Sequence, residues 1–529
     1  MTDDLTPRSD TQVGDWDGAV SDALRQILAS AAFAGSRRSR DFLAYVVTET
    51  LAGRGARLSE RTVARHALQY SDSFDGRHDA SVRVRASRVR RALEAYYESE
   101  GAEDLVRIEL PSGTYAPTFT LGTPVPRDGR RLEPGVLVMA FVSGGDAQPD
   151  AGTALSESIV GRLACFPGLR VIGPATSRVE DPARIGRQLG ARYVLQGSVV
   201  GQDDVLRLQA RVTDAESREI IWAVSDTLER DARHLWAVAD EWVDAIVGEL
   251  GDYAGVLLPR STGHTDGSLV GMEAAGSLAF YRYISDGTNA SLLQAREALG
   301  RARAAGTRSP AVLAMYANAV AAAAAYGLAD DEATDLEAAE AAAREALALD
   351  PRNAHAHLEL ATVALVRGQW DLVILRAREG VRLGALHPTM LATGAVLLAL
   401  AGAWDEGVAT MREALRLNPS HPGYMHQLFA LDRILAGDDA AALAEASLIH
   451  APDAYWGPFY RSLALAGLGY HDQARAEFSA AVALEPALAE DPWSVLGSYA
   501  RFTDEQQSVL LERVALVRDQ AGEASGAPD

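Results

Sequence analysis

Five arginines lie within nine residues of the segment Asp79–Gly101, whose sequence is DASVRVRASRVRRALEAYYESEG. The chain as a whole is acidic, with a formal net charge of −22, so this concentration of positive charge is local. Guanidinium groups bind phosphate oxygens well, because their planar fork of N–H donors matches the acceptor geometry. Grouped arginines also repel one another, and a polyanion would relieve that repulsion. The segment therefore predicts a binding site for a polyanion.

A helix over Asp79–Tyr97 would separate these arginines from the apolar side chains. At 100° per residue, one narrow stripe collects the apolar residues Val82, Ala86, Val89 and Leu93. The outward face would carry Arg83, Val84, Ser87, Arg88 and Arg91, and the stripe would be flanked by Arg85 and Arg90. Within the helix, only Glu94 offers a nearby carboxylate. We therefore expect arginines that are not paired along the helix.

The flanking sequence predicts the elements that would position this helix. SRRSRDFLAYVVTETLAG, residues 36–53, is a long amphipathic helix, and SERTVARHAL, residues 59–68, is a short one with a serine cap. VRIELPSGTYAPTF, residues 106–119, indicates a β-hairpin with its turn at Pro111–Gly113. Three helices followed by a hairpin is the plan of a winged helix-turn-helix, in which one helix enters the DNA major groove.

Residues 21–120 resemble the OmpR/PhoB-type winged helix and the CadC-like regulators that share it. The family's recognition helix has the pattern V-x-V-x-x-x-R-L-R-(R/K)-x-L, and its wing has G-x-G-Y-x-F. Here the matching stretches are VRVRASRVRRAL, residues 82–93, and SGTYAPTF, residues 112–119. The wing departs from the pattern, with serine at the first glycine and Ala-Pro inserted before the phenylalanine. The resemblance implies DNA contacts from Arg83, Arg85, Ser87, Arg88 and Arg90, a phosphate contact from Arg91, and a wing tip of Gly113 and Thr114 above Tyr115.

A chain of 529 residues should hold about three domains. Residues 1–20 are acidic and lack an apolar core, which indicates a disordered tail, and residues 121–135 are a linker rich in proline, glycine and arginine. Residues 136–255 alternate strand and helix patterns and then show three β-rich runs, which predicts a small α/β domain with an antiparallel meander. Gly144–Gly145 in that domain is interpreted as a turn. The stretches VLVMAFVSGGD, GLRVIGPATS and IGRQLGARYVLQGSV resemble a TolB amino-terminal-like domain.

Residues 268–521 are helical and repetitive. Turn glycines recur at intervals of 34, 35 and 32 residues, at Gly368, Gly402, Gly437 and Gly469. This spacing is typical of tetratricopeptide repeats, and about six copies fit between Met272 and Pro486, before a capping helix near residues 505–521. The resulting fold class is multidomain: a winged helix, a small α/β domain and an all-α solenoid, followed by a tail at residues 522–529. The concave face of the solenoid would bind a protein or peptide.

The sequence offers little for catalysis, metals or membranes. It contains no lysine, which excludes a Walker lysine and Schiff-base chemistry, and Cys165 is the only cysteine. His355 and His357 would lie on opposite faces of a repeat helix, so no metal site or cofactor is expected. The uncharged run at residues 310–329 is nearly long enough to span a bilayer, but its alanines and Asn318 favour a repeat helix. We expect a cytoplasmic protein that is not an enzyme.

Two functions remain open. The outward, unpaired arginines favour a bacterial transcriptional regulator that binds double-stranded DNA. The alternative is a non-catalytic signalling scaffold whose winged helix and repeats bind proteins, and it is favoured by the near-neutral first domain, where residues 21–120 hold 15 arginines and 13 acidic residues. A third and weaker option is a link to adenylate cyclases, since some relatives carry such domains, but no segment here is free to form one. With so small a net charge, one copy should bind DNA modestly, and a homodimer or tandem sites would help.

Overall fold

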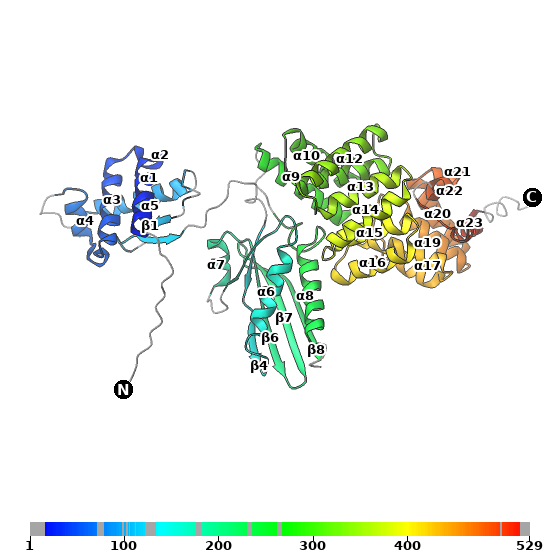
Figure 1. Cartoon of the computed structure of the whole chain (residues 1–529), viewed down its shortest axis with the longest axis horizontal. Coiled ribbons are helices and arrows are strands. Elements are labelled where there is room, and N and C mark those ends of the chain that lie inside the picture. Colours follow the sequence, from blue (N-terminus) through cyan, green and yellow to red (C-terminus); the bar gives the residue numbers. More distant parts are fainter. Residues whose placement is uncertain are drawn as a thin grey trace, which may run out of the picture. The chain divides into compact units, whose positions relative to one another are not determined.

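The computed structural model of the chain describes residues 16–70, 79–97, 100–101, 104, 106–111, 113–121, 134–175, 181–229, 235–261, 267–497 and 500–518 (Figure 1). The chain divides into two compact units, residues 1–131 and 132–529. The boundary falls within the predicted linker, most of which lies outside the described residues, as do most of the predicted N-terminal tail and all of the C-terminal one.

The first unit contains helices followed by a β-hairpin. Ser36 caps one helix by accepting a hydrogen bond from the Ser39 backbone N–H, and Ser59 caps the next in a capping box with Thr62. The predicted helices and strands are present, and a helix before them begins at Trp16, inside the predicted tail. The elements are α1 Trp16–Ala29, α2 Ala31–Ala34, α3 Arg37–Leu51, α4 Glu60–His66, α5 Ser81–Tyr97, β1 Val106–Glu109 and β2 Thr118–Leu121.

The core of this unit confirms the predicted apolar stripe of α5. Val82 and Val89 are fully buried, Ala86 and Leu93 are nearly so, and they pack with residues of α1, α3 and α4 in one cluster. The hairpin differs from the prediction, because β1 and β2 pair only from Val106–Leu121 to Glu109–Thr118. Residues 110–117, the hairpin loop, are therefore longer than the predicted turn. Pro111 and Pro117 have no N–H to extend the ladder into this loop.

In the second unit, the strands between residues 134 and 229 form a six-stranded mixed sheet. This sheet and the helices that cover it are here named the sheet domain. β3 lies parallel to both β5 and β6, and β6, β7 and β8 form the predicted antiparallel meander. The strands are β3 Gly135–Met139, β4 Val142–Gly145, β5 Arg170–Ala175, β6 Tyr193–Gln202, β7 Val205–Asp214 and β8 Ile220–Glu229.

The prediction of a turn at Gly144–Gly145 is wrong, because both residues belong to β4. This short strand pairs in parallel with β6 beyond the point where β3 ends. Gly145 has φ +63°, and a Cβ there would collide with the Gly201 carbonyl of β6, so only glycine fits. Glycine pairs are depleted in strands, which is why the pattern indicated a turn.

Helices cover the two faces of this sheet, in keeping with the predicted α/β pattern. Val136 and Val138 point to the face covered by α6 and α8, whereas Leu137 and Met139 point to the face where Ala183 of α7 packs. The alternation follows from the two-residue period of a strand. The helices are α6 Ala151–Leu163, α7 Pro182–Gln188 and α8 Leu235–Gly251.

Residues 268–518, the repeat array, are six consecutive helix pairs followed by shorter helices and a final long one. The predicted turn glycines have positive φ, which is 68° at Gly368, 99° at Gly402, 72° at Gly437 and 81° at Gly469, so the helical repeat and its turns are confirmed. The pairs are α9 Leu269–Asp286 with α10 Asn289–Ala304, α11 Pro310–Ala325 with α12 Glu332–Leu349, α13 Ala354–Val366 with α14 Trp370–Leu383, α15 Pro388–Leu400 with α16 Trp404–Leu417, α17 Gln427–Leu435 with α18 Asp439–Ser447, and α19 Trp456–Gly467 with α20 His471–Leu484. They are followed by α21 Ala487–Glu490, α22 Pro492–Gly497 and the predicted capping helix, α23 Asp504–Arg518.

The uncharged run at 310–329 forms α11, which packs between neighbouring helices of the array. Across the described residues, no helix combines the length and apolarity needed to cross a bilayer.

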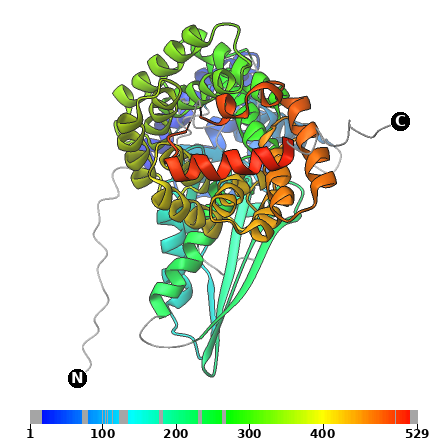
Figure 2. The same cartoon turned by 90° about the vertical axis from the view of Figure 1, so that its right-hand side faces the viewer.

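The array curves so that the connection between α9 and α10 contacts segments that join later helices. The Asn289 backbone N–H donates to Asp453 Oδ2 at 2.8 Å, and Gly287 lies close to Tyr424. Figure 2 shows the helices around a ring with α23, in red, lying across it. The segment before α23 is tied to the array by a main-chain hydrogen bond, in which the Arg501 N–H donates to the Leu400 carbonyl at 2.7 Å.

Candidate nucleic-acid interface

The outward residues of α5, here named the arginine face, are Arg83, Val84, Ser87, Arg88 and Arg91. Arg88 and Arg91 are exposed, and the side chain of Arg88 forms no hydrogen bond or ion pair with any residue that the structure describes. Arg91 Nη2 lies 3.4 Å from Ser87 Oγ, one helical turn earlier. Val84 is 49% exposed, which is unusual for a valine in the middle of a helix. The face thus presents guanidinium groups around one apolar side chain.

Arg83 forms an ion pair with a carboxylate of another helix. Its Nη1 donates to Glu60 Oε2 at 3.0 Å, in the first turn of α4. The pair joins two helices, so the expectation that the arginines are not paired along α5 still holds, but Arg83 is not a free cation. The side chain of Arg83 still keeps 52% of its surface exposed, so the pair lies at the edge of the arginine face.

Arg85 lies half-buried beside the core stripe, as expected for a flanking position. Its Nη1 is 3.2 Å from Ser36 Oγ and 3.4 Å from Ser39 Oγ, at the start of α3. This contact brings the first turn of α3 to the flank of α5. The exposed side chains of Arg37 and Arg38 follow directly in the chain, and Arg37 Nε lies 3.8 Å from Asp41 Oδ2, so part of this added positive charge is offset.

Arg90, on the other flank, points to the hairpin loop. Its Nε donates to the Leu110 carbonyl at 2.7 Å, and its Nη2 donates to the carbonyls of Pro111 at 3.0 Å and Thr114 at 3.3 Å. The resemblance implied that Arg90 faces DNA. The structure instead places its guanidinium against main-chain oxygens of the first unit.

The predicted wing tip lies on this loop. Gly113 is exposed and has φ +87°, a conformation that favours glycine. Thr114 is half-buried, and its Oγ1 accepts a hydrogen bond from the Ala116 N–H at 3.0 Å. Tyr115 packs edge-on against Phe42 of α3, with ring centroids 6.3 Å apart.

Tyr97 fixes the other end of the hairpin. Its hydroxyl oxygen accepts from the Ile108 N–H at 2.6 Å, and the guanidinium of Arg107 stacks 4.9 Å above its ring. Burial raises the pKa of Tyr97 to about 12, so the hydroxyl stays neutral at physiological pH. No sequence pattern singled out Tyr97, because its partner lies in the following strand.

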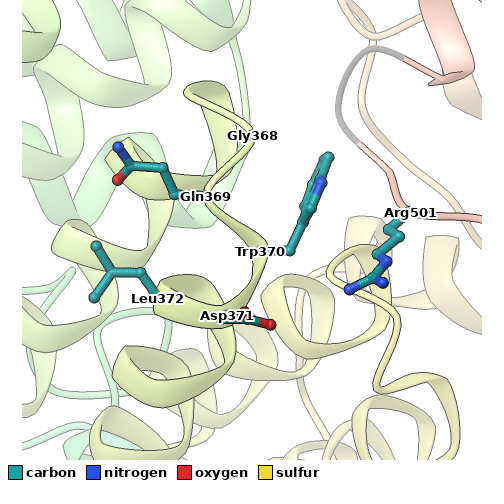
Figure 3. Close-up of a pocket in the computed structure, with 6 residues that line it drawn as sticks. All are labelled: Gly368, Gln369, Trp370, Asp371, Leu372 and Arg501. Atoms are coloured by element: carbon teal, nitrogen blue, oxygen red, sulfur yellow. The ribbon is translucent and has the colours of Figure 1, made fainter.

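The repeat array has a separate hollow, shown in Figure 3. It is open, encloses about 780 Å³, and is lined by Gly368, Gln369, Trp370, Asp371, Leu372 and Arg501. In Figure 3 the Trp370 ring and the Arg501 side chain lie next to each other, on two different segments of the array. An aromatic wall with a cation and a carboxylate can hold an extended peptide by stacking and hydrogen bonding. Among the described residues, no group of three or more His, Cys, Asp or Glu side chains could hold a metal ion.

Comparisons with known proteins give partial matches. No model of a known protein family matches the chain. Over 125 residues the chain is 30% identical to a Rhizobium meliloti (strain 1021) protein named "Putative adenylate cyclase 3", which is 22% of this chain and 21% of that protein. The chain therefore spans about a fifth of the length of this curated relative.

Two kinds of solved structure are similar in part. A PelC dodecamer from Paraburkholderia phytofirmans matches 21% of this chain and 83% of its own, at 20% identity and a TM-score of 0.17. YrrB, described as a TPR protein with an unusual peptide-binding site, matches 38% of this chain and 98% of its own, at 16% identity and a TM-score of 0.26. At such scores neither likeness decides the function of this chain.

Proposed function

We propose that the chain is a DNA-binding transcriptional regulator of the bacterial cytoplasm. Its first unit would act as a winged helix-turn-helix, with α5 in the major groove and the hairpin loop on the adjacent backbone. The observation that supports this most is the arginine face, where exposed Arg88 and Arg91 surround exposed Val84 on a helix whose opposite side is core. Arginine can bind guanine edges and phosphates, and an apolar side chain can contact the thymine methyl group.

The rest of the chain would supply regulation rather than chemistry. We propose that the sheet domain is TolB-like and that the array binds a protein or peptide at the hollow around Trp370 and Arg501. The activity named for the Rhizobium relative belongs to that protein, of which this chain matches 21%. We propose no catalysis here, because no nucleophile–base pair stands out in the sequence.

The full-length chain should shift a duplex DNA fragment captured from genomic DNA, and salt should weaken the complex. If about three arginines contact phosphates, affinity should fall roughly 40-fold between 50 and 200 mM salt, because each contact releases condensed counterions. An electrophoretic shift assay at several salt concentrations measures this slope. Arg344→Ala, which removes an exposed arginine from the array, is the control and should leave the slope unchanged.

Affinity that does not vary with salt would contradict DNA binding through the arginine face. Absence of any captured fragment would favour the alternative, a scaffold whose basic face binds an acidic protein. That alternative gains some support from Arg83, whose pairing with Glu60 reduces the free positive charge.

Partner binding by the array should depend on the hollow. Arg501→Ala is expected to weaken capture of an array-binding partner by roughly tenfold, the effect of losing one well-buried charged contact at an interface. Quantitative pull-downs of wild type and variant measure this, with Leu375→Ala, an exposed side chain of α14 outside the hollow, as the control. Equal capture by Arg501→Ala and wild type would place the partner elsewhere.

A further inference from the structure

We infer that Arg90 is a positioning residue that fixes the hairpin loop against α5, and that it does not contact DNA itself. The inference about the loop rests on contacts within the first unit. Its consequence for DNA rests on the proposed function.

The geometry assigns Arg90 to the loop. Its guanidinium reaches three main-chain oxygens, two before the exposed tip at Gly113 and one after it, at Leu110, Pro111 and Thr114. One rigid, planar group therefore holds both sides of the tip. Hydrogen bonds from a charged donor are stronger than neutral ones, and those at 2.7 and 3.0 Å have good lengths.

Little else among the described residues holds the loop in place. The ladder between β1 and β2 ends at Glu109–Thr118, and the prolines at 111 and 117 donate no hydrogen bonds. Within the loop, the Thr114 N–H reaches the Pro111 carbonyl only at 3.4 Å. Outside it, Tyr115 packs against Phe42. Arg90 is thus the direct polar link from α5 to the loop tip.

This link would set the spacing between two DNA-contacting parts. If α5 lies in the major groove, Arg90 holds Gly113 and Thr114 at a fixed offset from Arg88, two residues earlier on the same helix. A lysine could not replace it, because a single ammonium group lacks the planar fork that reaches several carbonyls together. The role explains why an arginine of a recognition helix would turn away from the groove.

The first test needs no DNA. In the full-length chain, Arg90→Ala should speed amide hydrogen exchange in residues 110–117 by roughly tenfold, which corresponds to the loss of a charge-assisted hydrogen bond. Arg90→Lys should restore this protection only in part, and Arg88→Ala is the control that should leave it unchanged. Circular dichroism checks that each variant stays folded. Unchanged exchange in folded Arg90→Ala would overturn the positioning role, whatever the chain binds.

The second test locates the loop on DNA. An iron chelate attached to the new thiol of Thr114→Cys, in a Cys165→Ser background, would cut the DNA backbone near the loop. With Arg90 present we expect cuts confined to one short stretch. In Arg90→Ala the cuts should spread and the strongest should weaken about fivefold or more, while the base preference read by α5 stays the same.

The two hypotheses fail in different ways. If Arg90→Ala flattens the base preference and leaves the cutting pattern intact, Arg90 reads DNA directly and the inference is wrong. If no variant, including the parent, binds or cuts DNA, the proposed function fails, and the hydrogen-exchange result alone decides the role of Arg90.

Discussion

Replacing Asp252 with alanine is expected to destabilise the second unit by about 3–5 kcal/mol. Asp252 follows α8 directly and is fully buried. Its carboxylate accepts hydrogen bonds from the Thr389 N–H at 2.9 Å and from Thr389 Oγ1 at 2.7 Å, and lies 2.7 Å from His387 Nδ1. Both partners belong to the start of α15. Alanine would leave their donors buried without an acceptor, which costs more than the lost bonds alone.

This carboxylate joins the sheet domain to the repeat array. Next to it in the chain, Tyr253 packs between the rings of Phe280, His355 and His387, all of the array. Nearby, Ser420 Oγ donates to Glu249 Oε1 of α8 at 2.7 Å. The sheet domain and the array also share one hydrophobic cluster. Loss of Asp252 should therefore loosen the docking of two parts that the sequence assigned to separate domains.

Urea unfolding followed by far-ultraviolet circular dichroism measures the effect, with limited proteolysis between α8 and α9 as a second readout. Asp240→Ala is the matched control, because Asp240 is exposed and its ion pair with Arg162 should contribute less than about 1 kcal/mol. An unfolding midpoint that is the same in Asp252→Ala and wild type would show that apolar packing alone docks the domain.

The contribution of Asp252 to the stability of the second unit should also depend on pH. Burial alone would raise the pKa of its carboxyl, but His387 and Thr389 outweigh this effect and lower the pKa below its ordinary value. A carboxyl whose pKa is lower in the folded than in the unfolded protein stabilises the fold fully at pH values above its unfolded-state pKa, which is near 4. That stabilisation is lost as the pH falls through the folded-state pKa. The difference in the free energy of unfolding between wild type and Asp252→Asn should therefore become smaller below about pH 4.

Local patterns predicted the elements well. The helical period placed Val82 and Val89 in the core, a serine cap marked the start of α4, and turn glycines marked the repeats. The helical period, the cap and the turn glycines each depend on residues only a few positions apart, so they can be recognised in the sequence itself. The strand β4 was missed for the same reason, since its glycines locally resemble a turn while its pairing with β6 is distant.

The groups that contact the side chains of the candidate site are distant in the sequence, so local patterns could not identify them. Glu60 reaches Arg83 from another helix, and the carbonyls that bind Arg90 come from a loop 20 to 24 residues further along. Asp252 and Thr389 are 137 residues apart. Helical geometry predicts which direction a side chain takes, but the group that it meets is set by tertiary packing. The sequence therefore located the arginine face and could not distinguish its structural arginines from its free ones.

Among the free arginines of α5, base reading and phosphate binding should fall to different residues. Arg88 is exposed near the middle of the arginine face, where a helix in the major groove comes closest to the bases. Its loss in Arg88→Ala should reduce discrimination between the best and other sequences by about 1–3 kcal/mol, or roughly 5- to 150-fold, since arginine can bind guanine through two hydrogen bonds.

Arg91 lies about one turn further along, where the helix should leave the groove toward the backbone. Arg91→Ala should therefore weaken all sequences alike and make the salt slope shallower by about one. A binding-preference profile of each variant measures both effects. Neither side chain belongs to the buried stripe, so circular dichroism should show both variants folded. If folded Arg88→Ala and Arg91→Ala both keep wild-type affinity and preference, α5 does not read DNA, and its exposed arginines are better explained by an acidic protein partner.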